Sequence, residues 1–385
     1  MRIALISHQV GFGDGQGRVN YEIARATLDA GHDLTLIAER CAEDLSSHER
    51  GTFISIATSK LPTRFLKNLS FAIRSARWLK KNRRSIDLVQ ANGFITLARV
   101  DIVAAHFVHG AWLHSPYASP SETRWTASGI YQRIYSRLNS ILEQTALRRA
   151  RKVVAVSKNV ADELVSVGVA ADRIVIIFNG VDTDEFCPRL TDRSVNGAPA
   201  GALTFLFAGD LRTSRKNFDG VLQAIGAVEG VHLAAAGGIT NSPFPALAKR
   251  LGVADRVHFL GQVKNMSDLM VATDGFLFPS RYDPFGLVVL EAMASGLPVI
   301  TSAATGASAV LQDPQWCIED PEDHEELVNK VRRLAESPSL RAEIGLENRQ
   351  KSLAHSWHSM AEAYISLYRD LNLQDSVKQG SVEDS

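Results

Sequence analysis

The chain has 385 residues, with 42 basic and 42 acidic side chains and a formal net charge of zero. This length exceeds what one hydrophobic core usually holds, so we expect two domains of roughly 150–200 residues each. A hydrophobic fraction of 45% and a charged fraction of 22% exclude a disordered or fibrous protein. The cysteines, Cys41, Cys187 and Cys317, lie far apart, which argues against a disulfide framework or a structural zinc site.

The sequence shows no secretion signal, since the apolar run at residues 3–6 is only as long as a strand. No stretch approaches the roughly 18 apolar residues of a membrane span. We therefore expect a cytoplasmic protein, peripheral at most on the cytoplasmic face of the membrane. Residues 1–185 carry 24 basic and 18 acidic groups, a net +6, which leaves 18 basic and 24 acidic groups, a net −6, for the remainder. This asymmetry indicates an anionic partner for the first half, or ordinary scatter of surface charge.

Short strand patterns alternate with helical patterns from the first residues onward. This alternation predicts a parallel sheet with helices on both faces. A helix is expected at 19–30, and strands are expected at 3–7, 33–38, 87–90, 101–106, 152–157 and 173–178.

Residues 188–202 have the Pro, Gly, Asn and Ser content of a linker, and the alternation restarts after them. The second set of strands is expected at 203–208, 232–236, 257–260, 275–278 and 298–301. The sequence thus predicts an α/β protein with two doubly wound, Rossmann-like domains facing each other across a cleft. These domains are residues 1–187 and 203–355, and the polar residues 374–385 are expected to form a disordered tail.

A glycine-rich segment, GFGDGQG, spans residues 11–17 after the first strand. Glycines let the backbone approach a phosphate or sugar, and the next helix offers its positive end, so Gly15 and Gly17 are candidate ligand contacts. The dinucleotide fingerprint fails, because Gln16 and Arg18 stand where the third glycine belongs in the two registers. Glu39 lies near the position of a ribose-binding acid, and a plain flexible turn remains the alternative.

The strongest motif is GFLFPSRYDPFGLVVLEAMASGLPVITSAATG at residues 275–306. It resembles the donor-site signature of the family-4 glycosyltransferases of the GT-B fold, in which an acid and then a glutamate follow "PS". The corresponding pair is Asp283 and Glu291, with Phe285, Gly286 and Leu287 between them. The family usually has Glu at the first of these positions, so it is open whether Asp283 fully replaces it.

The resemblance implies a role for each residue of this segment. The helix that follows Gly286 can hold a diphosphate without a metal, through the N–H groups of its first turn and its dipole. Glu291 lies about one turn deeper, where its carboxylate can accept both ribose hydroxyls. Asp283 can reach hydroxyls of the transferred sugar.

Other segments resemble the same family. Asn179–Asp182 resembles its "NGVD" turn, and 257–263 resembles a segment whose final backbone, here at Val263, contacts the base in relatives. Residues 356–373 resemble the helix that crosses back to the first domain. The family also has an arginine and a lysine after the first strand of the second domain. Here Arg215 and Lys216 match well, whereas Asp210 occupies the usual arginine position and Arg212 is its candidate replacement.

A histidine closes the expected strand at 101–106. Relatives carry a histidine there close to the sugar, so His106 is a candidate catalytic residue and His109 the alternate. The resemblance also makes Asp283, Lys216 and Arg215 candidate catalytic residues. Asp182-Thr-Asp184 matches the D-x-D string of metal-dependent transferases, but it follows the NGV turn, so we interpret it as a turn or cap. We predict no metal site.

Residues 64–84 contain eight basic residues, no acid and an apolar helical stripe. The stripe fits either a basic amphipathic helix on an anionic membrane or packing against the sheet with a basic outer face. The basic residues lack interleaved aromatic residues, so nucleic acid is not an expected partner.

The resemblance implies a retaining glycosyltransferase that needs no cofactor and moves a hexose from a UDP- or GDP-sugar to a saccharide or lipid-linked acceptor. A basic first half favours a role in bacterial-type polysaccharide, lipopolysaccharide or glycolipid biosynthesis. Three alternatives stay open: a nucleotide-sugar epimerase, an NAD-dependent oxidoreductase and a non-catalytic nucleotide-sugar binding module.

Overall fold

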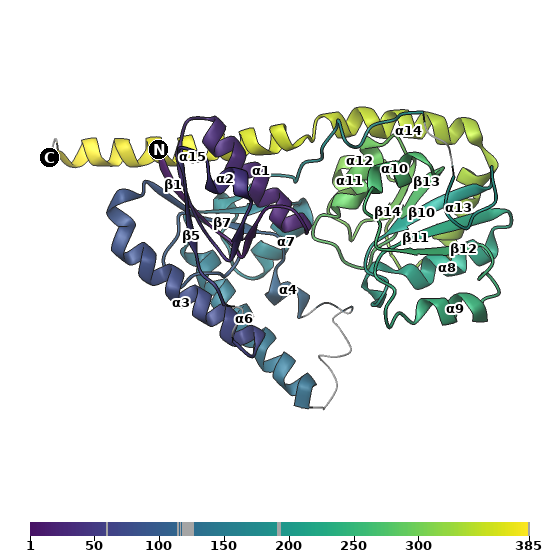
Figure 1. Ribbon diagram of the computed structural model, residues 1–385, viewed down its shortest axis with the longest axis horizontal. Helices are drawn as coiled ribbons and strands as arrows, with labels where there is room; N and C mark the ends of the chain where they lie inside the picture. The colour runs from purple at the N-terminus through teal and green to yellow at the C-terminus, as the bar shows by residue number, and fades with distance from the viewer. Residues whose placement is uncertain (59–60, 114, 116, 118–126, 191–193, 384–385) are drawn as a thin grey trace. The chain divides into compact units, whose positions relative to one another are not determined.

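The computed structural model describes residues 1–385 except 59–60, 114, 116, 118–126, 191–193 and 384–385 (Figure 1). It divides into two compact units, Met1–Asn179 with Trp357–Ser385, and Gly180–Ser356. The first unit thus ends earlier than the predicted boundary at 187. The physical reason is that the segment after Asn179 pairs within the second unit, where the Val181 N–H donates to the His355 carbonyl over 3.0 Å.

The first unit is built on seven parallel strands in the order β5-β3-β1-β6-β7-β8-β9. Their bounds are β1 (Arg2–Ile6), β3 (Asp33–Ala38), β5 (Gly51–Ser55), β6 (Leu88–Asn92), β7 (Ile102–Ala105), β8 (Lys152–Ala155) and β9 (Ile174–Ile176), and β2 (Gln9–Val10) pairs separately with β4 (Arg40–Cys41). The main helices are α1 (Gly15–Asp29), α3 (Arg64–Asn82), α6 (Ala127–Arg149), α7 (Lys158–Ser166) and α15 (Trp357–Glu383), and the shorter ones are α2 (Glu43–Ser46) and α4 (His109–Trp112).

The second unit repeats this architecture with six parallel strands in the order β12-β11-β10-β13-β14-β15. The strands are β10 (Leu203–Ala208), β11 (Val231–Ala236), β12 (Val257–Gly261), β13 (Gly275–Phe278), β14 (Val299–Ser302) and β15 (Cys317–Ile318). The helices are α8 (Phe218–Ala227), α9 (Phe244–Arg250), α10 (Met266–Val271), α11 (Leu287–Ala294), α12 (Ser308–Leu311), α13 (His324–Glu336) and α14 (Pro338–Leu353), preceded by the 3-10 turn η3 (Ser214–Lys216). The two units confirm the prediction of two doubly wound, Rossmann-like domains.

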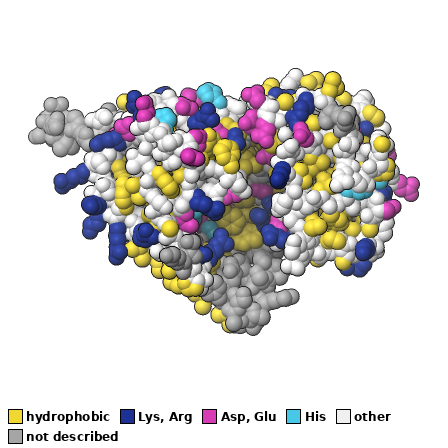
Figure 2. All heavy atoms as spheres, in the orientation of Figure 1, with side chains coloured by type: hydrophobic (Ala, Val, Ile, Leu, Met, Phe, Trp, Pro, Cys, Tyr) yellow, Lys and Arg dark blue, Asp and Glu magenta, His cyan; other side chains and the backbone are white. Residues whose placement is uncertain are grey.

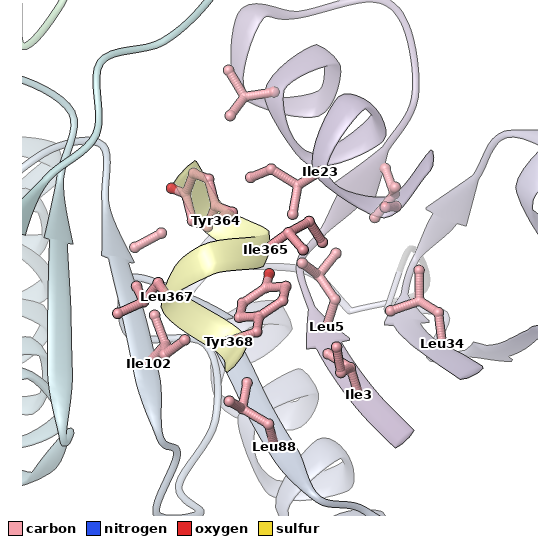
Figure 3. Packing of buried hydrophobic residues seen from close by; sticks show 14 of the residues in the cluster. Ile3, Leu5, Ile23, Leu34, Leu88, Ile102, Tyr364, Ile365, Leu367 and Tyr368 are labelled. Carbon is pink, nitrogen blue, oxygen red and sulfur yellow. The ribbon is translucent and has the colours of Figure 1, made fainter. Parts of the chain in front are cut away.

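Helix α15 completes the core of the first unit, although it comes last in the chain. Figure 3 shows Tyr364, Ile365 and Tyr368 of this helix beside Ile3 and Leu5 of β1, and all five are buried in one cluster. The expectation of a disordered tail from 374 is corrected, because α15 continues to Glu383 and Asp375 forms an ion pair of 2.6 Å with Arg151. A helix anchored by its first turns propagates readily, even where its composition is polar.

Helix α3 contains most of the basic segment 64–84. Phe71, Ala72, Ser75 and Leu79 are buried, so much of its apolar side packs into the unit. The stripe residues Phe65, Leu69, Ile73 and Ala76 are only partly buried, so both alternatives remain for this segment. Figure 2 shows Lys and Arg side chains along the left edge of this unit, where α3 lies. Within the described residues, no helix combines the length and the apolar character needed to cross a membrane.

Candidate active site

In each sheet the order of strands reverses beside the first strand, between β1 and β6 in the first unit and between β10 and β13 in the second. Doubly wound sheets bind ligands at the carboxyl ends of the strands at such points. The loops after β10 and β13 carry the predicted donor-site residues 209–217 and 279–286. The topology therefore brings two motifs together that are some 70 residues apart in sequence.

Lys216 and Asp283 form the centre of this group in the second unit. The Lys216 ammonium donates to Asp283 Oδ2, and only 8% of the lysine side chain is exposed. The ammonium also lies 5.1 Å from the centre of the Phe278 ring. Burial lowers the pKa of Lys216, and the neighbouring carboxylate of Asp283 opposes that shift only in part. The structure thus holds a buried cation against the acid that was predicted to contact the sugar.

The turn that carries Lys216 is held in place by Arg281. The Arg281 guanidinium donates to the Ser214 carbonyl at 2.6 Å, to both carboxylate oxygens of Asp219 at 2.7 and 2.8 Å, and to Glu322. Burial alone would lower the pKa of Arg281, but the hydrogen bonds to the two acids raise it above its usual value. Asn217 follows in a left-handed conformation, with φ of 55°, and its side chain accepts the Gly220 N–H, so it caps helix α8, which starts at Phe218.

Gly286 starts helix α11 beside the same acid. Its φ of 85° is left-handed, and an added Cβ would lie 2.7 Å from Cγ2 of Thr305. No side chain caps the helix, and the N–H groups of Leu287 and Val288 have no acceptor among the described residues. Two unused donors and the positive end of the helix dipole therefore lie next to the Lys216–Asp283 pair, an arrangement that suits an anion.

Of the remaining donor-site candidates, three are partly exposed and one is paired with an acid. Glu291 and Val263 are partly exposed, Glu291 in α11 and Val263 in the loop after β12. Arg215 is partly exposed, and its charge lowers the pKa of Lys216, so it adds positive potential to the site. Arg212 is different, because its guanidinium donates two hydrogen bonds to the carboxylate of Asp210, at 2.8 and 3.2 Å. Arg212 therefore neutralises the acid that occupies the usual arginine position.

Phe285 is placed for packing. Its side chain is buried, its N–H donates to Asp283 Oδ1 at 3.2 Å and its carbonyl accepts from Ala307 at 2.6 Å. In this structure Phe285 therefore fixes the position of Asp283, and its own backbone groups are occupied.

In the first unit the glycine-rich loop leads into α1. Asp14 caps the helix by accepting the Gly17 N–H at 2.6 Å, and a Cβ at Gly17 would lie 2.7 Å from the Gly11 carbonyl oxygen. Gly17 is thus required for close packing, and its N–H is occupied. Gly15 is exposed at the first helical position, so a contact through its backbone remains a prediction.

His106 and His109 share a pocket at the carboxyl ends of β1, β6 and β7. The pocket has a volume of about 170 Å³ and is also lined by His8, Gln16, Asn92, Tyr135 and Glu143. Nε2 of His106 is buried without a hydrogen-bond partner in the described part of the chain, and burial lowers the pKa of His106 to about 4. His109 instead bonds the buried Glu143 through Nδ1 at 2.9 Å.

The D-x-D string forms a turn, as predicted. Asp182 Oδ1 accepts the N–H groups of Asp184 at 3.2 Å and Glu185 at 3.0 Å. Among the residues with described positions, no three His, Cys, Asp or Glu side chains gather in a way that could hold a metal ion.

Sequence reasoning missed Arg281 and Glu143. Arg281 lies inside the motif at residues 275–306, two residues before Asp283, and this position was a signal that could have identified it. Glu143 had none, because it reaches His109 from a helix 34 residues further along the chain.

Comparison with known proteins agrees with this fold. A family model described as Glycosyltransferase Family 4 matches residues 13–185, and one described as Glycosyl transferases group 1 matches residues 188–351. Sucrose-phosphate synthase from Thermosynechococcus elongatus superposes with a TM-score of 0.79 at 22% identity, over 96% of this chain and 98% of that one. Anabaena Alr3699/HepE in complex with UDP-glucose gives a TM-score of 0.72 at 19% identity, over 96% and 100%.

These matches define the class of protein as a glycosyltransferase with the GT-B fold. Among characterised sequences, the MMP alpha-(1->4)-mannosyltransferase of Mycolicibacterium hassiacum is 26% identical, over 96% of this chain and 98% of its own length. The two family models together cover nearly all of the chain outside α15, and this chain belongs to the family-4 glycosyltransferases.

Proposed function

We propose that the protein is a retaining, metal-independent transferase that moves a hexose from a nucleotide-diphosphate sugar to an acceptor hydroxyl. The observation that carries this proposal is the buried Lys216–Asp283 pair beside the uncapped start of α11. A related fold holds UDP-glucose in Anabaena Alr3699/HepE, which supports a UDP-sugar as the first donor to test.

Lys216 links the two parts of the donor in this proposal. An ammonium has three N–H donors, so it can keep its bond to Asp283 and also donate to a phosphate oxygen. Arg215 and the N–H groups of Leu287 and Val288 hold the same diphosphate, and Glu291 accepts the ribose hydroxyls. As the diphosphate leaves it gains negative charge, and cations already in place stabilise that charge without reorganisation.

The reaction breaks the bond between the anomeric carbon and the diphosphate oxygen and forms one from that carbon to the acceptor oxygen. The acceptor hydroxyl attacks from the face that the nucleotide leaves, and the leaving phosphate takes its proton. Asp283 and His106 fix the sugar, Gly15 contributes backbone, and the first unit holds a saccharide or lipid-linked acceptor. No cofactor takes part.

The basic face of α3 favours an acceptor in polysaccharide or glycolipid assembly, near an anionic membrane.

Donor binding is the first experiment. UDP-, GDP- and ADP-hexoses are screened by thermal unfolding, since a ligand at a hundredfold excess over its dissociation constant stabilises the folded state by about 2.7 kcal/mol. The wild type is expected to be stabilised by one of them, and Lys216→Met to lose that stabilisation together with turnover. Lys249→Met, an exposed lysine on α9 of the same unit, is the matched control. Equal donor turnover by Lys216→Met and the control contradicts the proposal.

Product analysis separates the alternatives. A product that keeps the anomeric configuration of the donor supports a retaining reaction. A rate of transfer that EDTA does not change supports a metal-independent one. Conversion of the donor without acceptor indicates an epimerase, and an absorbance change with NAD indicates an oxidoreductase. Donor binding without turnover for any acceptor indicates a binding module.

A further inference from the structure

Helix α6 exposes a line of large apolar side chains on its outer face. Ile130, Ile134, Leu138 and Ile141 are between 41% and 61% exposed, and their spacing of three to four residues places them on one side of the helix. We call these four residues the α6 stripe. Single exposed apolar residues are ordinary, whereas a contiguous line on one helix indicates a contact surface.

Five arginines line a pocket at the end of the same helix. This arginine pocket consists of Arg99, Arg148, Arg149, Arg151 and Arg173. Arg151 is ion-paired with Asp375, and Arg148 and Arg173 donate to neutral carbonyl oxygens. Arg99 and Arg149 are exposed and have no carboxylate partner within the described residues. The pocket therefore carries a large uncompensated positive charge.

The stripe and the pocket adjoin each other. A small cavity of about 140 Å³ shares Arg99 and Arg149 with the arginine pocket and is otherwise lined mostly by apolar side chains that include Leu97, Val100 and Leu142, with Thr96 and Thr145 as polar ones. Leu97 is 48% exposed. No acidic side chain is among these lining residues, and Leu142 directly follows Ile141 of the α6 stripe in the sequence.

The arginine pocket shares no lining residue with the His106 pocket, whereas the small cavity borders that pocket at Gly93 and Phe94. Arg99, Arg151 and Arg173 lie just before β7, β8 and β9, at the amino ends of these strands. The His106 pocket lies at their carboxyl ends. Helix α3 runs beside α6 (Figure 1), and Asn68 of α3 donates to the Tyr135 hydroxyl of α6 at 3.0 Å, a contact that lies at the His106 pocket.

We propose that the α6 stripe and the arginine pocket form a docking site for an anionic lipid bilayer. The arginine pocket takes the phosphate of a lipid headgroup, and the stripe enters the boundary between headgroups and acyl chains. Guanidinium groups suit phosphate because they donate two parallel hydrogen bonds, and helices that lie on membranes combine such cations with an apolar face. Charge complementarity favours the bilayer over an apolar protein surface, which would leave the arginines uncompensated.

Sedimentation with vesicles tests the proposal on the full chain. Vesicles of phosphatidylcholine with 30% phosphatidylglycerol are expected to bind the wild type, and pure phosphatidylcholine vesicles to bind it weakly. Ile141→Glu is expected to lower the partition coefficient about tenfold, since it removes one inserted side chain. Arg99→Glu with Arg149→Glu is expected to lower it by at least about 25-fold, from about fivefold for each of the two lost cations, with a further loss from the two added carboxylates.

Matched variants on the second unit serve as controls. Leu346→Glu changes a side chain of similar exposure, 62% against 61% for Ile141, and Lys249→Glu with Arg250→Glu gives the same change in charge. Both are expected to bind vesicles as the wild type does. Should Ile141→Glu fail to fold, Ile134→Gln replaces it.

Three results overturn the proposal. The first is equal binding to neutral and anionic vesicles, and the second is an equal loss in the test and control variants. The third is thermal stabilisation of the wild type by inorganic phosphate or glycerol phosphate without vesicle binding, which assigns the arginine pocket to a soluble anion. None of these readouts involves the sugar donor, so they are independent of the proposed activity.

Discussion

The His106 imidazole is buried in its pocket, and its Nε2 has no hydrogen-bond partner among the described residues. This burial affects how stability depends on pH. Its pKa of about 4 lies below the value of about 6.5 in an unfolded chain. Between these two pH values the unfolded chain binds a proton that the folded chain does not, so stability falls as the pH falls. At pH 5 the loss from this residue is about 2 kcal/mol.

The prediction is checked by urea unfolding of the wild type and His106→Gln at pH 7.5 and pH 5. The wild type is expected to lose about 2 kcal/mol more than the variant over this interval. His358→Gln, an exposed histidine on α15, serves as the control and should keep the wild-type dependence on pH. If His106→Gln also keeps that dependence, His106 is protonated in the folded state.

At the residue scale, the sequence predicted those positions whose neighbours in sequence are also their neighbours in space. Asp283 and Gly286 belong to one motif, and the start of a helix after a glycine followed from local rules. The direct ion pair of Lys216 with Asp283 did not follow, because it depends on how two loops from different strands meet. Arg281 was missed for the same reason, since its partners Asp219 and Glu322 lie 62 and 41 residues away.

The entry to helix α11 depends on a glycine, and this gives a prediction at the scale of an element. Gly286→Ala meets two costs, a left-handed backbone and a Cβ 2.7 Å from Cγ2 of Thr305. We expect a loss of about 1–3 kcal/mol in unfolding free energy and a loss of nucleotide binding, since the N–H groups of the first turn shift. Thermal unfolding with and without the donor measures both effects.

Gly252→Ala separates the two costs. Gly252 is also left-handed, with φ of 71°, but nothing lies within 4 Å of an added Cβ, so this variant carries the backbone strain alone. It is expected to be less destabilised than Gly286→Ala and to keep donor binding. Adding Thr305→Ser to Gly286→Ala removes the clashing methyl group and should restore part of the loss. Unchanged donor binding in Gly286→Ala would separate this helix start from the donor site.

At the same scale, the central strands were predicted, as were the edge strands β9 and β12, whereas the edge strands β5 and β15 were not. Strands β10, β13 and β14 are buried on both faces, and their sequences are mostly apolar without a polar alternation. Strand β5 lies at a sheet edge and is only partly buried, and β15 has two residues, so neither leaves a clear pattern. Helix α6 was likewise not recognised as an exposed apolar surface, because its outer stripe resembles the core-facing side of any helix.

At the scale of the whole molecule, two doubly wound units followed from the alternation of strands and helices, repeated after a linker. That pattern did not predict that the first unit is built from two distant segments. Only the resemblance of the last helix to that of relatives predicted it. A sequence pattern shows that a helix has an apolar side, but it does not show which sheet that side covers. Tyr364 and Tyr368, at 1% and 0% exposure, show how completely α15 is incorporated.

Within this core one buried hydrogen bond links α15 to strand β6. The Tyr368 hydroxyl donates to Gln90 Oε1 at 2.6 Å, whereas the Tyr364 hydroxyl, also buried, has no partner among the described residues. Tyr368→Phe leaves the Gln90 oxygen without its donor and is expected to destabilise the first unit by about 1–3 kcal/mol. Tyr364→Phe removes an unpaired hydroxyl of the same kind and is expected to be neutral or slightly stabilising. Because two units need not unfold together, hydrogen exchange in β1 and β6 is the measurement, and equal exchange in the two variants contradicts the prediction.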